Sequence, residues 1–230
     1  MVPIFKYMFG QRRFEVYEPE IPSGHPPVVL VHGLLHRGIV MRTLAAALRR
    51  AGRKVYVYDY RTTRKPVEAH GVELADFLMK LDCPELDIVT HSMGGLLARV
   101  ALDRLAKTGR LDRIGRVVML APPHHGSEAA SWWVAHFPPS RVLVRSLPDL
   151  ADTPEAAVHR LPVPDGVEIG IIAGSRDGKV SESSTRLGTE CDRIVIDSAH
   201  AFMMNKPEAQ RLILNFLDFG CFRPDKISKK

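Results

Sequence analysis

Ser92 lies where an apolar strand pattern changes into a helical one, within Thr-His-Ser-Met-Gly-Gly at residues 90–95. Residues 86–89 favour a short buried strand, and apolar residues at helical spacing follow from Leu96. A serine in a tight turn between a strand and a helix is typical of a nucleophile. The start of the helix then offers free N–H groups and a positive dipole to a developing oxyanion.

Gly94 and Gly95 follow this serine at positions where a side chain would collide with the strand, because the helix must begin close to it. A small residue is more common two positions before such a serine, whereas this chain has the β-branched Thr90. An ordinary turn with a helix-capping serine is the alternative. The order of strand, serine, two glycines and helix favours the nucleophile turn.

A serine hydroxyl is a weak nucleophile and needs a neighbouring base. Where such a turn occurs, the order along the chain is nucleophile, acid and histidine. His200 follows the apolar run 194–196 and precedes the last helical pattern, so it is the predicted base. The other downstream histidines fit less well because they lie in or beside an irregular stretch: His124, His125, His136 and His159.

Asp177 is the predicted acid, because it turns the chain just after the strand pattern of residues 168–173. A role only in an Asp-Gly turn is the alternative. Asp197, three residues before His200, is the main rival, and Asp149 is a lesser one.

An oxyanion needs two backbone donors. One is expected to be the N–H of Met93, directly after the nucleophile, and the other that of Leu34, after the strand pattern 28–31. Gly33 permits an unusual backbone there. His32 and His36 have the spacing of metal ligands on a helix, but Gly33 disfavours a helix and no glutamate follows His32, so no metal is expected there. Catalysis by an activated serine implies no cofactor either.

Apolar runs alternate with amphipathic patterns, which indicates a mostly parallel sheet flanked by helices. We expect about six or seven strands. The predicted strands cover 28–31, 55–58, 86–89, 117–120, 168–173 and 194–196, with 14–17 as an antiparallel edge candidate. The predicted helices cover 40–50, 72–81, 96–107 and 208–219. All of these belong to a single domain, residues 1–230.

Residues 122–165 break this rhythm, being rich in proline and without a clear strand. Loops at the carboxyl ends of strands are where such sheets bind ligands. We expect a short lid or active-site wall, with Trp132, Trp133 and Phe137 as substrate-binding residues. An ordinary surface connection with buried aromatic side chains is the alternative.

The composition suits one globular domain, with 230 residues of which 45% are hydrophobic and no apolar run long enough for stable membrane insertion. The net charge is +6, but the basic residues are scattered, which argues against nucleic-acid binding. The first ten residues lack a secretion-signal pattern, which favours the cytoplasm. The oligomeric state is left open.

Five segments together resemble the α/β-hydrolase superfamily, in particular small bacterial lipases and esterases. They are His32-Gly33, residues 90–95, residues 121–127 (Ala-Pro-Pro-His-His-Gly-Ser), Asp177-Gly178 and Ser198-Ala199-His200. The resemblance extends over roughly residues 25 to 220 and implies the α/β-hydrolase fold. It also implies a catalytic triad of Ser92, Asp177 and His200, with Leu34 and Met93 forming the oxyanion hole.

By this resemblance the chain is expected to be a serine hydrolase that cleaves small-molecule carboxylic esters, with short to medium acyl chains, through an acyl-enzyme. The same triad would serve a thioesterase, an amidase or an acyltransferase, because one scaffold hosts many chemistries. A non-catalytic α/β-hydrolase-like protein that binds a ligand is the alternative from another class.

Overall fold

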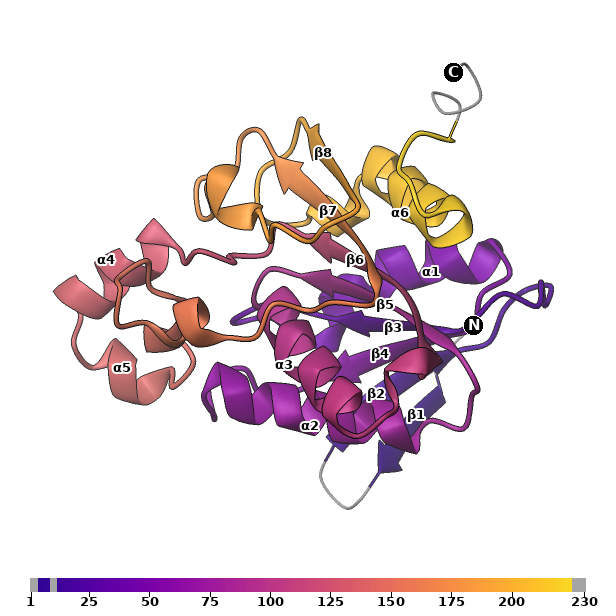
Figure 1. Cartoon of the computed structure of the whole chain (residues 1–230), viewed down its shortest axis with the longest axis horizontal. Helices are drawn as coiled ribbons and strands as arrows, with labels where there is room; N and C mark the ends of the chain where they lie inside the picture. Colours follow the sequence, from indigo (N-terminus) through magenta and orange to yellow (C-terminus); the bar gives the residue numbers. More distant parts are fainter. Residues whose placement is uncertain (1–3, 9–11, 225–230) are drawn as a thin grey trace.

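The computed structural model describes residues 4–8 and 12–224, which form an eight-stranded sheet with helices on both faces (Figure 1). The strands are β1 (Ile4–Met8), β2 (Arg12–Tyr17), β3 (Val28–Val31), β4 (Val55–Asp59), β5 (Leu86–His91), β6 (Ile114–Leu120), β7 (Glu168–Gly174) and β8 (Asp192–Ile196). The α-helices are α1 (Arg42–Arg50), α2 (Val67–Lys80), α3 (Met93–Lys107), α4 (Glu128–His136), α5 (Ser140–Leu143) and α6 (Pro207–Phe219). The 3-10 helices are η1 (Gly38–Met41), η2 (Leu111–Arg113), η3 (Pro148–Leu150), η4 (Ala157–Arg160), η5 (Ser183–Thr185) and η6 (Met203–Asn205). Residues 1–3 and 9–10, part of the segment expected to lack a secretion signal, lie outside the described residues.

The strand order is β1-β2-β4-β3-β5-β6-β7-β8, and every pair from β4 to β8 is parallel. The mostly parallel sheet is therefore confirmed. Residues 14–17 do lie in an antiparallel strand, β2, but not at the edge, because the unpredicted β1 pairs with its outer side. This hairpin brings the count of described strands to eight.

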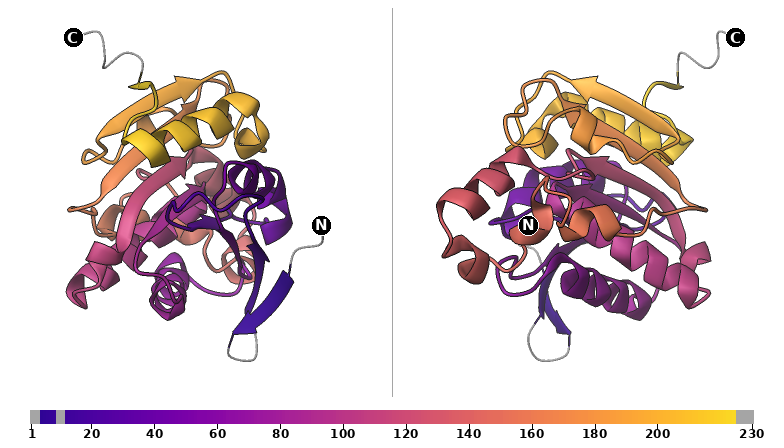
Figure 2. Two further views of the ribbon diagram at one scale, coloured as in Figure 1. Left: turned by 90° about the vertical axis from the view of Figure 1, so that its right-hand side faces the viewer. Right: turned by 60° about the vertical axis from the view of Figure 1, so that its left-hand side comes forward.

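Each face of the sheet carries its own apolar core, because the central strands β3 and β5 are buried along their whole length. Helices α2 and α3 cover one face, whereas α1 and α6 cover the other (Figure 2). The connection between β6 and β7 carries α4 and α5 and lies beyond the carboxyl ends of the strands, at the left in Figure 1. None of the described helices has the length and apolarity needed to span a membrane.

Helix α2 begins at Val67, five residues before the predicted start at residue 72. Gly71 lowers the helical propensity of this turn, so the pattern alone favours a later start. In the structure, a Cβ atom at Gly71 would lie 2.4 Å from Cβ of Val100 in α3. The glycine therefore allows the two helices to pack closely, and tertiary contact outweighs its low propensity.

A buried ion cluster fixes the end of β5 that is remote from Ser92. The guanidinium of Arg53 donates to Asp87 of β5 at 2.6 Å and to Asp218 of α6 at 2.7 Å. The side chains of Arg53 and Asp87 are only 1% and 3% exposed. Burial raises the pKa of Asp87, although hydrogen bonds from Arg116 N–H and from Arg53 oppose this effect.

Arg53→Met should lower the free energy of unfolding by about 3–5 kcal/mol, because it leaves the Asp87 carboxylate buried without its counter-ion. Lys54→Met is the matched control, since Lys54 pairs with Glu18 at a more exposed site, and should cost less than about 1 kcal/mol. Urea unfolding of both variants measures the difference. Equal costs would show that the buried cluster contributes no more than a surface pair.

Candidate active site

Ser92 occupies a sharp turn between the end of β5 and the start of α3. Its φ is +52°, in the left-handed region that residues with a side chain rarely adopt. The turn is held because Ser92 N–H donates to the carbonyl of Leu120 at 2.8 Å and Gly95 N–H donates to the Ser92 carbonyl at 2.9 Å. The predicted arrangement of strand, serine and helix is therefore present.

Both glycines after the serine lie in close contact with their surroundings. A Cβ atom at Gly94 would lie 2.7 Å from the carbonyl oxygen of Val31 in β3, and one at Gly95 would lie 2.8 Å from Cβ of Pro122. Both positions lack room for a side chain, as predicted, but the closest contacts are with β3 and Pro122 and not with the preceding strand β5. Thr90, the β-branched residue two positions before the serine, is completely buried.

A continuous chain of hydrogen bonds joins the three predicted residues Asp177, His200 and Ser92. His200 Nδ1 lies 2.7 Å from Asp177 Oδ2, and His200 Nε2 lies 2.9 Å from Ser92 Oγ. The Asp177 and His200 side chains are only 1% and 7% exposed. Parallel strands end at one edge of the sheet, so residues distant in sequence meet there.

The Asp177 carboxylate also accepts backbone hydrogen bonds from Lys179 at 2.9 Å and Val180 at 3.0 Å. Burial by itself raises the pKa of Asp177, but the hydrogen bond with His200 and these backbone donors outweigh it. The net result is a pKa below the usual value, so Asp177 is ionised and can accept the Nδ1 proton of His200.

The rival acids are engaged elsewhere. Asp197 is 71% exposed and pairs with Arg176 at 2.5 Å. Asp149 accepts the backbone N–H of Val67 at 2.8 Å. Among the described residues, His200 is the histidine that hydrogen-bonds to the hydroxyl of Ser92.

His91, directly before Ser92, is a neighbour of the triad that the sequence pattern did not indicate. It is completely buried, and its Nε2 donates to the backbone carbonyl of His200 at 3.0 Å. Burial lowers the pKa of His91 to about 3, so the ring stays neutral. Its position in a wholly buried strand was the available signal, since a buried histidine requires a partner.

The two predicted oxyanion donors belong to segments that adjoin Ser92, the loop after β3 and the start of α3. A Cβ atom at Gly33 would lie only 2.8 Å from Cβ of Ser92, so the loop that contains Leu34 closely approaches the hydroxyl. Among the described residues, no acceptor binds the N–H of Leu34. Met93 is the first residue of α3, where N–H groups have no partner within the helix.

A cavity of about 400 Å³ opens beside Ser92 and His200. Its wall is mainly apolar and comes largely from the connection between β6 and β7. The residues from that connection are Pro123, Ser127, Ala129, Ala130, Trp133, Phe137, Ser140, Leu143, Val144, Leu147 and Leu150. Trp133 and Phe137, two of the three predicted aromatic residues, thus line the cavity, whereas Trp132 lies outside this lining and stacks on His136 at 4.8 Å.

This wall is attached to the rest of the domain by polar contacts. Arg99 of α3 donates to the carbonyls of Leu161 at 2.6 Å and Pro162 at 2.8 Å. Ser146 Oγ donates to the carbonyl of Thr62 at 2.8 Å. The segment expected to be a lid or wall is therefore fixed at several points and contains two short helices, α4 and α5.

Within residues 4–8 and 12–224, no group of three or more His, Cys, Asp or Glu side chains is arranged to hold a metal ion. His32 instead lies 3.3 Å from Asp59 through its Nε2 atom, and His36 lines the cavity.

Solved structures of low sequence identity share this fold. A lipase of Bacillus licheniformis in its mature form matches with a TM-score of 0.68 at 18% identity, covering 90% of this chain and 98% of that one. A monoacylglycerol lipase of Paleococcus ferrophilus matches with a TM-score of 0.67 at 18% identity, and the match covers 91% of this chain and 99% of that one. An enol-lactonase of Burkholderia xenovorans matches with a TM-score of 0.68 at 16% identity, and the match covers 94% of this chain and 100% of that one. These similarities establish an α/β-hydrolase fold.

Sequence comparison gives a nearer relative and a family. A carbendazim hydrolyzing esterase of Nocardioides sp. is 31% identical over 122 residues, and the match spans about half of each protein, 48% of this chain and 48% of the esterase. The family model described as a domain of unknown function, DUF7379, matches residues 17–135. Because that match covers more than half of the 230 residues, the chain belongs to the DUF7379 family, with the fold of the α/β-hydrolases.

Proposed function

We propose that this protein is a serine hydrolase that cleaves carboxylic esters through an acyl-enzyme. The observation that carries the proposal is the hydrogen-bonded chain from Asp177 through His200 to Ser92 at the mouth of an apolar cavity. Each of these contacts is within the hydrogen-bond distance that proton transfer to a base requires. The esterase and lipase names among its relatives support the same activity.

In the proposed reaction, Ser92 Oγ attacks the ester carbonyl while His200 Nε2 takes its proton. Ionised Asp177 holds the imidazole in the required tautomer and stabilises its charged form. The backbone N–H groups of Leu34 and Met93 receive the developing oxyanion. His200 then protonates the leaving alcohol, and later removes a proton from the water that hydrolyses the acyl-enzyme.

The substrates we propose carry short to medium acyl chains. The cavity beside Ser92 holds about 400 Å³, which suits a small apolar group. Trp133 and Phe137 contribute to its wall, and Lys179 is the charged side chain in its lining. Such a wall favours an uncharged hydrocarbon acyl group over a polar one.

A fluorophosphonate probe and a panel of esters of graded acyl length test the proposal. The panel should include thioesters, amides and carbendazim, because the same triad serves those reactions and one relative hydrolyses carbendazim. We expect the probe to label Ser92 and the esters to give the highest kcat/KM. A folded protein that neither reacts with the probe nor turns over any substrate would instead be a ligand-binding member of the fold.

Ser92→Ala should abolish labelling and lower kcat by about 10⁴-fold or more, because the attacking oxygen is removed. Circular dichroism should show an unchanged fold, and the unfolding midpoint should not fall, since alanine introduces no larger group. Full activity in the folded variant would refute the proposed nucleophile.

Asp177→Asn should lower kcat by about 10⁴-fold, because the amide favours the wrong imidazole tautomer. Asp197→Asn is the control, since this carboxylate is exposed and pairs with Arg176, and its kcat should stay near that of the unmodified protein. Steady-state kinetics on one ester compare the two. The reverse ranking would assign the acid role to Asp197.

Trp133→Ala should reduce the gain in kcat/KM per added methylene, which at full burial corresponds to about 0.8 kcal/mol. The rate on an acetate ester should change least, because its acyl group extends least into the cavity. Trp132→Ala is the matched control, since the neighbouring ring stacks on His136 outside the cavity lining. Identical chain-length profiles for all three proteins would place the acyl group elsewhere.

A further inference from the structure

The oxyanion loop, defined here as residues 32–37 between β3 and η1, has little regular structure of its own. Leu35 has a φ of +57°, and the loop's own backbone contributes a hydrogen bond of 3.3 Å from His36 N–H to the Gly33 carbonyl. A loop of this kind keeps one conformation only when its surroundings impose it.

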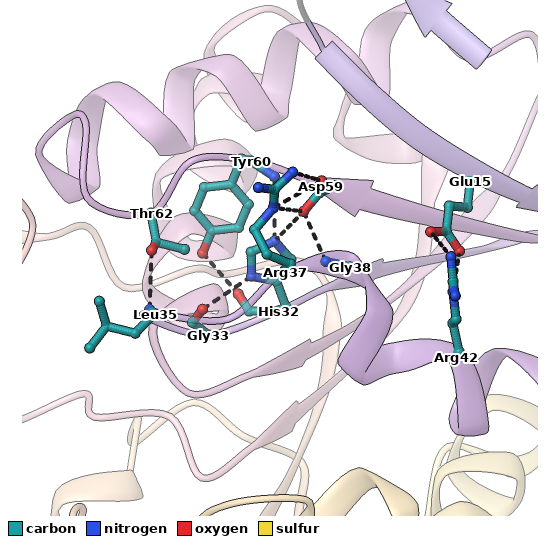
Figure 3. Close-up of polar contacts among 10 residues, drawn as sticks. All are labelled: Glu15, His32, Gly33, Leu35, Arg37, Gly38, Arg42, Asp59, Tyr60 and Thr62. Carbon is teal, nitrogen blue, oxygen red and sulfur yellow. Dashed lines mark hydrogen bonds and ion pairs between the residues drawn. The ribbon is translucent and has the colours of Figure 1, made fainter. Parts of the chain in front are cut away.

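The end of β4 and the residues directly after it supply these surroundings through three side chains, Asp59, Tyr60 and Thr62 (Figure 3). Tyr60 Oη donates to the His32 carbonyl at 2.8 Å, and Thr62 Oγ1 accepts the N–H of Leu35 at 3.1 Å. Asp59 accepts from the backbone N–H directly after the loop, that of Gly38, at 2.8 Å. The loop is therefore held at both ends and in the middle.

A further contact, within the loop itself, acts directly on a proposed oxyanion donor. His32 Nδ1 lies 3.1 Å from the Gly33 carbonyl oxygen, and because a carbonyl only accepts, Nδ1 carries the proton. The Gly33 carbonyl and the Leu34 N–H belong to the same planar peptide group. Fixing the direction of the carbonyl therefore fixes the direction of the N–H on its opposite side.

The His32 ring is itself held in place. It is completely buried and stacks on Tyr60 with 4.4 Å between the ring centres. Its second nitrogen, Nε2, lies 3.3 Å from Asp59 Oδ1, and the backbone nitrogen of Tyr60 lies at the same distance from it. Rotation of the ring would break both contacts as well as the bond to Gly33.

Asp59 is in turn kept ionised. Arg37 donates to its two carboxylate oxygens at 3.0 and 2.8 Å. Burial raises the pKa of Asp59, but the hydrogen bonds with His32, Arg37 and the Gly38 N–H outweigh it and hold the pKa far below its usual value. The carboxylate thus offers a fixed negative charge beside Nε2.

We propose that Asp59 and His32 are positioning residues that orient the Leu34 N–H towards the oxyanion, through the chain Asp59, His32 and the Gly33 carbonyl. This inference rests on the proposed function and adds a second carboxylate–imidazole pair to it. The first pair acts on the nucleophile, and the second acts on the oxyanion donor. Neither Asp59 nor His32 touches the reacting atoms.

Complete loss of one oxyanion donor costs about 10²–10³ in kcat. A donor that remains but is poorly directed should cost less, so we expect His32→Phe to lower kcat by about 10- to 100-fold. Phenylalanine keeps a ring against Tyr60 but has no proton for the Gly33 carbonyl. His32→Asn should recover much of this loss, because the asparagine amide places an N–H near the position of Nδ1.

The decisive readout is selective for the oxyanion. A trifluoromethyl ketone forms a tetrahedral adduct with an active serine, whereas the corresponding carbinol binds without an oxyanion. We expect His32→Phe to weaken binding of the ketone by the same factor by which it lowers kcat. KM and the affinity for the carbinol should not change. The carbonyl stretch of the acyl-enzyme should move to higher frequency in infrared difference spectra, because the carbonyl is less polarised.

Asp59→Asn provides a second variant in case His32→Phe fails to fold, and should change the same readouts in the same direction. Arg42→Gln is the matched control, since it breaks the neighbouring ion pair with Glu15 (Figure 3) without contacting the loop. Circular dichroism and phosphonate labelling of Ser92 verify the fold of each variant.

The inference is overturned if the folded variants keep full kcat, if ketone and carbinol weaken equally, or if His32→Asn is as impaired as His32→Phe. The proposed function itself is refuted by another result: the unmodified protein is not labelled by the probe and hydrolyses no substrate in the panel. Failure of the positioning role leaves that protein active, so the two outcomes are distinguishable.

Discussion

The backbone of Ser92 is the constraint on which the rest of the site depends. A left-handed conformation at a residue with a side chain costs about 1–2 kcal/mol, so contacts around the turn must offset it. The N–H of Ser92 is bound by β6, and α3 can begin at once only because Gly94 lies against β3. The turn at Ser92 therefore also requires that β3 and β6 lie on the two sides of β5.

The sequence was sufficient to predict which candidate catalytic residue follows which strand. Ser92, Asp177 and His200 follow three different strands, and parallel strands end at a common edge, so the order along the chain largely determines which side chains meet. The need for a glycine at position 94 was predictable from the tight turn, but its contact with β3 was not. Each of these predictions depends on local patterns and on one rule of topology.

The sequence could not predict contacts between segments that share no sequence pattern. The link from Asp59 to His32 joins the ends of neighbouring strands, and neither residue has a distinctive local context. Residues Trp132 and Trp133 are equally aromatic, but adjacent residues on a helix point about 100° apart, so the cavity receives only one of them. The start of α2 was misplaced because the packing against Val100 is invisible in its own residues.

Thr62 belongs to both halves of the site at once. Its side chain accepts a hydrogen bond from the N–H of Leu35 in the oxyanion loop, and its backbone carbonyl accepts one from the hydroxyl of Ser146, a completely buried residue of the connection between β6 and β7. Any displacement of the wall at Ser146 would therefore act through Thr62 on the oxyanion loop. A ligand too large for the cavity would still enter by displacing the wall, and would in doing so misalign the donors. Size discrimination would then act on turnover instead of on binding, so that a bulky ester would be held as an inhibitor.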